Sequence, residues 1–277
     1  MAFAAVAFAG ACSGAPAVDD ESVEYANAMA AEHADETTDA TPATGTIVPI
    51  GELRPAYFGE VAGYVARPPG GAESLGGVIL VHEWWGLNEN IEAVAERLAS
   101  EGFTVLAVDM YLGERAEDAE GARALMMQSF EDPAAMAANI AAASSWLAQS
   151  EQVPDVTVMG YCYGGGVSLS TAMNAPSAVD AAIVYYGHIP DDLSAVAAID
   201  DPMLLHFGEL DGGIPLESVR RLEGAMADAP VGAMIHVYEG AEHAFANPSG
   251  QRYQAAAAEL SWERTLEFLR QVESTTP

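Results

Sequence analysis

The residue best suited to nucleophilic chemistry is a cysteine between glycines, in Gly160-Tyr161-Cys162-Tyr163-Gly164. An apolar run precedes this segment and a stretch with helical spacing follows it, so it matches the G-x-[S/C]-x-G pattern of a nucleophile elbow. The glycines avoid collisions between side chains and backbone in a strained turn, and the helix N-terminus favours a thiolate. The alternative is a buried structural cysteine in a glycine-rich turn.

Two further residues with acid-base chemistry follow apolar runs later in the chain. Asp211 comes shortly after the run 203–207, and His243 comes shortly after the run 234–238. The order of nucleophile, acid and histidine is that of α/β-hydrolases. Individually, Asp211 could cap a helix and His243 could be a surface loop residue. Together, their order and positions favour a triad in which His243 takes the proton of Cys162 and Asp211 orients the imidazole.

The other histidines in the second half of the chain suit structural roles better. His206 and His236 lie inside apolar runs and are expected in the core or the sheet, whereas His188 could line a pocket. His82-Glu83 lacks the second histidine of H-E-x-x-H, and the sequence contains no cluster of Cys and His. We therefore expect neither a metal nor a cofactor.

Alternating strands and helices must position these residues. We expect strands at 57–67, 77–82, 103–109, 157–160, 181–186, 203–207 and 234–238, and helices at 88–100, 116–130, 133–149, 164–173, 215–227 and 254–272. This alternation predicts an α/β fold, a doubly wound and mostly parallel sheet over residues 50–277. In such sheets ligands bind beyond the carboxyl ends of the strands, where the candidate residues lie.

Several motifs in the same order resemble the dienelactone hydrolase family of α/β-hydrolases, also called carboxymethylenebutenolidases. The resemblance covers about residues 50–277. It rests on the segments 81–88 (VHEWWGLN), 109–111 (DMY), 160–165 (GYCYGG), 185–187 (YYG), 208–211 (GELD), 240–245 (GAEHAF) and 263–269 (ERTLEFL). It implies the same triad of Cys162, Asp211 and His243.

The resemblance also implies supporting residues around the thiol. Glu83 corresponds to the family's extra carboxylate beside the nucleophile. The backbone N–H groups of Trp84 and Tyr163 would form the oxyanion hole. Aromatic residues that could line the substrate pocket, or could equally serve as packing, are Trp85, Tyr111 and Phe245.

The sequence departs from the family at two positions. Dienelactone hydrolases bind the carboxylate of their substrate with two arginines, and here those positions hold Gly113 and Asn247. Arg115 and Arg252 lie nearby and could substitute if their loops turn inward; otherwise they are surface charges. The resemblance therefore implies the catalytic triad but does not imply specificity for dienelactones.

The predicted activity is hydrolysis of a carboxylic ester or lactone by a Cys-His-Asp triad with a thioester intermediate. A general carboxylesterase that acts on neutral esters is the alternative enzyme, and the missing arginines favour it. A non-catalytic, surface-tethered binding protein on a hydrolase scaffold is the alternative outside enzymes, since a fold alone does not establish a function.

Charge excludes several classes of partner. The 277 residues include 41 Asp and Glu against 10 basic residues, all of them Arg, and the net charge is −31. Such a charge repels nucleic acids and anionic membrane surfaces. A lysine-free acidic surface is also typical of proteins adapted to concentrated salt. We expect a monomer whose partner is a small-molecule ester or lactone.

The first 49 residues have a different character from the rest. An apolar run over residues 2–10 followed by Ala11-Cys12-Ser13 resembles a lipoprotein signal peptide, although no basic residue precedes the run. This predicts a signal peptide at 1–12, export to the periplasm or cell surface, and acylation of Cys12; a cytoplasmic protein is the alternative. Residues 13–49 are rich in Ala, Asp, Glu, Thr and Pro, with at most a turn or two of helix near 23–33, and predict an acidic disordered tether.

Overall fold

The computed structural model describes residues 18–36, 54–227 and 229–275. Seven strands of this part form one sheet in the order β3-β5-β4-β6-β7-β8-β9, in which only β3 runs antiparallel to its neighbour. Their bounds are β3 Tyr64–Ala66, β4 Gly77–Val81, β5 Thr104–Val108, β6 Val156–Tyr161, β7 Ala181–Tyr185, β8 Met203–Gly208 and β9 Ala233–Tyr238. A separate ribbon pairs β1 Ala56–Phe58 with β2 Val61–Ala62. The predicted mostly parallel sheet is confirmed.

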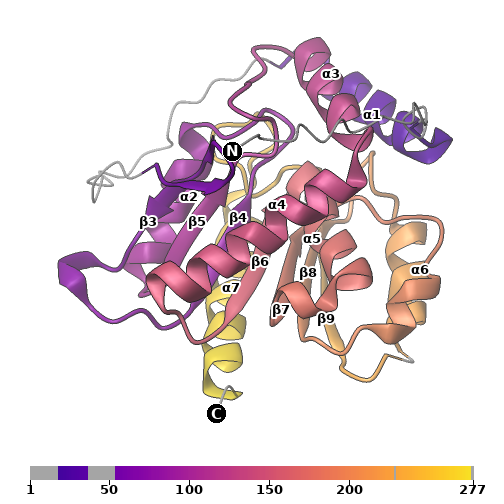
Figure 1. Cartoon of the computed structure of the whole chain (residues 1–277). Coiled ribbons are helices and arrows are strands. Elements are labelled where there is room, and N and C mark those ends of the chain that lie inside the picture. Colours follow the sequence, from indigo (N-terminus) through magenta and orange to yellow (C-terminus); the bar gives the residue numbers. More distant parts are fainter. Residues whose placement is uncertain (1–17, 37–53, 228, 276–277) are drawn as a thin grey trace, which may run out of the picture.

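Helices cover both faces of this sheet (Figure 1). The bounds are α2 Glu89–Ser100, α3 Ala119–Phe130, α4 Pro133–Trp146, α5 Tyr163–Asn174, α6 Leu216–Met226 and α7 Ala255–Thr275. Helices α4 and α5 lie on one face, and α2 and α7 lie together on the other, where Arg97 of α2 donates to Glu259 of α7 at 3.2 Å. The fold is an α/β fold of the α/β-hydrolase type, as predicted.

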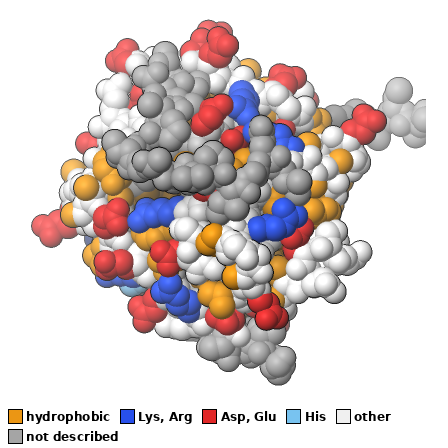
Figure 2. Space-filling view, turned by 90° about the vertical axis from the view of Figure 1, so that its left-hand side faces the viewer, with side chains coloured by type: hydrophobic (Ala, Val, Ile, Leu, Met, Phe, Trp, Pro, Cys, Tyr) orange, Lys and Arg blue, Asp and Glu red, His pale blue; other side chains and the backbone are white. Residues whose placement is uncertain are grey.

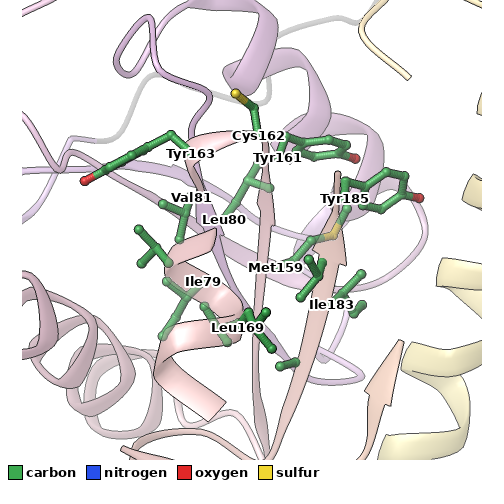
Figure 3. Close-up of a cluster of buried hydrophobic side chains, with 14 of the residues drawn as sticks. Ile79, Leu80, Val81, Met159, Tyr161, Cys162, Tyr163, Leu169, Ile183 and Tyr185 are labelled. Carbon is green, nitrogen blue, oxygen red and sulfur yellow. The ribbon is translucent and has the colours of Figure 1, made fainter. Parts of the chain in front are cut away.

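Local sequence explains these elements. The residues of β4 and β5 are all buried, because both faces of a central parallel strand are covered by helices. The side chain of Asn88 accepts from the backbone N–H of Ile91 at 3.3 Å and caps α2, while Pro133 occupies the first turn of α4. Figure 3 shows the aliphatic side chains packed between sheet and helix, with the sulfur of Cys162 directed away from them at the end of β6.

A further helix, α1 Asp20–Glu32, lies beside α3 at the carboxyl edge of the sheet (Figure 1). Ala26 and Met29 are fully buried there. The predicted disordered tether over residues 13–49 is therefore wrong for this segment, because the helix exchanges solvent for packing against the domain. Residues 1–17 and 37–53, with the predicted signal peptide and the rest of the tether, lie outside the described residues.

Candidate active site

Cys162 occupies a strained turn between β6 and α5. Its backbone has φ 54° and ψ −117°, a conformation that a residue other than glycine rarely adopts. A Cβ atom at Gly160 would lie 2.1 Å from the carbonyl oxygen of Gly164, and one at Gly164 would lie 2.4 Å from that of Val81. Both positions therefore require glycine. The backbone N–H of Cys162 donates to the Tyr185 carbonyl at 3.0 Å and fixes the turn.

His243 and Asp211 form a buried pair in the loops after β9 and β8. Nδ1 of His243 lies 2.8 Å from Oδ2 of Asp211, and both side chains are fully buried. Oδ1 of Asp211 accepts from the backbone N–H groups of Gly213 at 2.9 Å and Ile214 at 2.8 Å, which hold the carboxylate in place. With Nδ1–H donating to Asp211, Nε2 of His243 is the acceptor nitrogen. This buried atom has no hydrogen-bond partner within the described part of the chain.

The charges around His243 favour its protonated form. Burial disfavours the imidazolium, but the negative charges of Asp211 and of a Cys162 thiolate outweigh it and raise the pKa of His243 well above its usual value. Asp211 and Cys162 are thus the acidic groups that interact with the imidazole, and the buried pair of Asp211 and His243 can stabilise an imidazolium.

Glu83 follows β4 at the same edge of the sheet and is 4 % exposed. Burial raises the pKa of its carboxyl to about 7, although His243 and a hydrogen bond from Asn247 oppose the shift. Nδ2 of Asn247 donates to Oε2 of Glu83 at 2.6 Å. A carboxyl with such a pKa exchanges its proton near neutral pH and so can act in acid-base chemistry.

His82 has a structural role beneath this loop. Its Nε2 accepts from the backbone N–H of Met110 at 3.1 Å, so its Nδ1–H donates to the Glu83 carbonyl at 2.6 Å. Burial lowers the pKa of His82, which keeps the ring neutral. His206 is likewise buried, as the sequence predicts, and its Nδ1 lies 2.8 Å from the hydroxyl of Tyr238.

The proposed oxyanion and pocket residues all lie near this edge. Tyr163 is the first residue of α5, where a backbone N–H has no acceptor within the helix, and Trp84 directly follows Glu83. The ring of Trp85 packs at a tilt against that of Trp84 with centroids 5.0 Å apart, and Tyr111 packs against Tyr163 at 5.3 Å. Phe245 is fully buried.

Both candidate arginines form ion pairs with carboxylates of this chain. Arg115 is near Glu89 at 3.2 Å and Glu92 at 3.6 Å on α2. Arg252 forms an ion pair with Glu36 at 2.9 Å. The two family arginine positions are also occupied otherwise: the backbone N–H of Gly113 donates to Asp109 at 2.6 Å, and Asn247 donates to Glu83.

No group of three or more His, Cys, Asp and Glu residues in the described ranges could hold a metal ion. None of the helices described is both long and apolar enough to cross a bilayer. On the face shown in Figure 2, acidic side chains are dispersed among the basic ones.

Comparison with known proteins identifies the family. The model of the dienelactone hydrolase family matches residues 61–273. The chain belongs to this family. A carboxymethylenebutenolidase of Pseudomonas putida is 28% identical over 229 residues, which cover 79% of this chain and 94% of that protein. Protein usf of Aquifex pyrophilus is 31% identical over 224 residues, covering 76% and 94%.

Solved structures agree with this family and fold. A protein from Klebsiella pneumoniae assigned to the dienelactone hydrolases superposes with a TM-score of 0.68 at 26% identity, covering 80% of this chain and 98% of that one. An esterase of Thermogutta terrifontis, 18% identical, gives a TM-score of 0.62 over 82% of this chain and 96% of its own, and so shares the fold.

Tyr25 of α1 and His33, which follows this helix, lie next to the candidate residues and were missed from the sequence; both precede the part matched by the family. The hydroxyl of Tyr25 lies 4.0 Å from Sγ of Cys162. The ring of His33 packs against Trp84 at 5.0 Å and against His243 at 5.7 Å. A signal was present: Asp19 caps the helix, acids follow it, and the buried residues Tyr25 and Met29 are four positions apart.

Proposed function

We propose that the protein hydrolyses a carboxylic ester or lactone with Cys162 as nucleophile, His243 as base and Asp211 as the residue that orients the base. The observation that carries this proposal is the buried 2.8 Å contact between His243 and Asp211, with Nε2 of the imidazole left as an acceptor near the strained cysteine. Membership of the dienelactone hydrolase family supports it.

The proposed reaction begins with transfer of the thiol proton to Nε2 of His243. The thiolate attacks the ester carbonyl carbon, and the oxygen takes up the negative charge while the backbone N–H groups of Trp84 and Tyr163 bind it. The C–O bond then breaks, and His243 returns its proton to the leaving alcohol. A thioester remains on Cys162.

Water completes the cycle. His243 takes a proton from a water molecule, whose oxygen attacks the thioester carbonyl. Cleavage of the C–S bond releases the acid, and the proton on His243 returns to the sulfur of Cys162. Acid-base catalysis by a positioned histidine contributes about 10²–10⁴-fold. A thiolate leaves more readily than an amine, so this chemistry suits activated esters and strained lactones better than amides.

A second candidate function is a carboxylesterase that acts on neutral esters. The ion pairs of Arg115 and Arg252, together with the bond from Asn247 to Glu83, favour it, because both nearby guanidinium groups already pair with carboxylates of this chain. The proposed pocket residues are Trp85, Tyr111 and Phe245.

The experiment compares two cysteine variants of the full chain. Cys162→Ala should abolish hydrolysis of p-nitrophenyl acetate and leave the thermal unfolding curve nearly unchanged, whereas Cys12→Ala should keep full activity. Mass spectrometry of the acetate reaction should find the acetyl group on the peptide that contains Cys162. Equal activity of Cys162→Ala and the unmodified protein would contradict the proposal.

We also propose that the chain is exported as a lipoprotein and acts as a monomer. The apolar run at 2–10 followed by Cys12 supports export. Metabolic labelling with palmitate should mark the protein, and Cys12→Ala should remove the label; size-exclusion chromatography should give the mass of one chain. Unlabelled protein in the cytoplasmic fraction would contradict export.

A further inference from the structure

Helix α1 covers the thiol of Cys162. The hydroxyl of Tyr25 lies 4.0 Å from Sγ, a long hydrogen-bond contact in which either atom could be the donor, and Tyr25 itself is 5% exposed. Cys162 is 2% exposed and His243 is fully buried. The Tyr25 side chain therefore occupies space next to the sulfur, where the acyl group of a thioester would have to extend.

Polar contacts hold this helix at both ends. Oε1 of Glu21, in its first turn, lies 3.1 Å from Nε2 of His188 and accepts from the backbone N–H of Asp191 at 2.6 Å. At the other end, Arg252 donates to the Glu32 carbonyl at 3.2 Å. The same arginine donates to the His243 carbonyl at 3.2 Å, so it joins the end of α1 to the catalytic loop.

The middle of α1 is fixed by packing and by one exposed hydrogen bond. Met29 is fully buried, and a Cβ atom at Gly213 would lie 3.3 Å from its sulfur, which places Met29 against the loop that carries Asp211. On the outer face, Nε of Arg123 on α3 donates to Asn27 at 2.8 Å. Helix α1 is thus built into the domain as a wall of the site.

We propose that Tyr25 is a specificity-determining residue whose ring restricts the acyl group accepted by Cys162 to a short one. This inference rests on the proposed function, since it concerns the acyl group that the same thiol would carry. It goes beyond the family, whose matched region begins at residue 61 and does not include Tyr25. The restriction is steric, and both the hydroxyl that approaches the sulfur and the ring that carries it contribute to it.

The test measures kcat/KM for p-nitrophenyl acetate, butyrate, hexanoate and octanoate with the full-length protein. Tyr25→Ala should raise the ratio of hexanoate to acetate about tenfold, because each methylene group that gains buried space is worth up to about fourfold. Tyr25→Leu should give an intermediate ratio and preserves an apolar side chain at this position. Tyr25→Phe keeps the ring and removes only the hydroxyl, so it should change the ratio less than Tyr25→Leu and Tyr25→Ala do.

Asn27→Ala is the matched control. It removes the exposed bond between α1 and α3 without changing the wall beside the sulfur, so it should leave the ratio unchanged. An unchanged ratio in Tyr25→Ala and Tyr25→Leu would overturn the inference. An equal rise in Asn27→Ala would also overturn it, since loosening of the helix would then be the cause.

A second measurement does not depend on catalysis. Mass spectrometry can follow alkylation of Cys162 by iodoacetamide and by the bulkier N-(1-pyrenyl)maleimide. Tyr25→Ala should speed the maleimide reaction at least tenfold relative to iodoacetamide, and Tyr25→Phe should not. If esters are not hydrolysed through Cys162, the proposed function fails; if they are, but neither the ratio nor alkylation responds to Tyr25, only this inference fails.

Discussion

The unfolding free energy of the unmodified protein should fall as pH rises because of Glu83, and Glu83→Gln should remove this fall. Burial raises the pKa of Glu83 from 4.5 to about 7, which means that the folded state favours the protonated carboxyl. This contribution to stability is fully present below pH 4.5 and is lost as pH rises through 7, because the unfolded state releases its proton first. Gln has the same shape, is always neutral and can still accept from Asn247.

The magnitude follows from the two pKa values. A rise from 4.5 to about 7 corresponds to about 3 kcal/mol of unfolding free energy, of which about 2.5 kcal/mol is lost between pH 5 and pH 8. The full figure applies because Glu83 is only 4 % exposed. Glu83→Gln should lack this loss. The difference in unfolding free energy between the variant and the unmodified protein should therefore change by about 2.5 kcal/mol between pH 5 and pH 8.

Urea unfolding at pH 5 and pH 8, followed by circular dichroism, measures this difference. Glu60→Gln is the matched control, because Glu60 lies exposed in a turn and its loss should leave the pH dependence as it is. If Glu83→Gln and the unmodified protein lost the same free energy between the two pH values, the carboxyl would be ionised throughout, and the argument from burial would be refuted.

Three other predictions follow from the site. Asp211→Asn should lower kcat by about 10²–10⁴-fold in an ester assay with little change in KM, because His243 loses the carboxylate that orients it. Gly164→Ala should lower the urea unfolding free energy by about 1–3 kcal/mol, because its Cβ would collide with the Val81 carbonyl; Gly224→Ala, with open space around it, should not. Neutral esters should have at least about tenfold higher kcat/KM than matched esters with a free carboxylate, in low and in molar salt, since salt screens the charge of −31 but restores no lost contact.

The sheet and the positions of the candidate residues could be predicted because both follow from local patterns. Continuous apolar runs such as 77–82 and 103–109 correspond to β4 and β5, since a parallel strand covered on both faces needs apolar side chains throughout. Parallel strands also end at one edge. Side chains far apart in sequence, such as Asp211 and His243, therefore meet once they follow such strands.

Helix α1 could not be predicted with the same security because its burial depends on a distant partner. Its residues include many alanines and acids, and such a composition is typical of a solvated segment. The acids lie where they cap the helix or reach polar partners such as His188, while Tyr25 and Met29 face the site. The overall composition of a segment does not distinguish its buried face from its exposed face. A helix with few buried residues therefore has the composition of a solvated segment.

The substitutions at the family arginine positions and the covering of the site by α1 form one connected change. Asn247 donates to Glu83, so a neutral amide replaces a cation next to a carboxyl that burial already favours in its neutral form. The nearby guanidinium of Arg252 binds Glu36 and the end of α1 instead of a substrate. A cation that would attract a carboxylate thus anchors the helix that brings Tyr25 to the thiol. The proposed specificity for short, neutral esters rests on both halves of this arrangement.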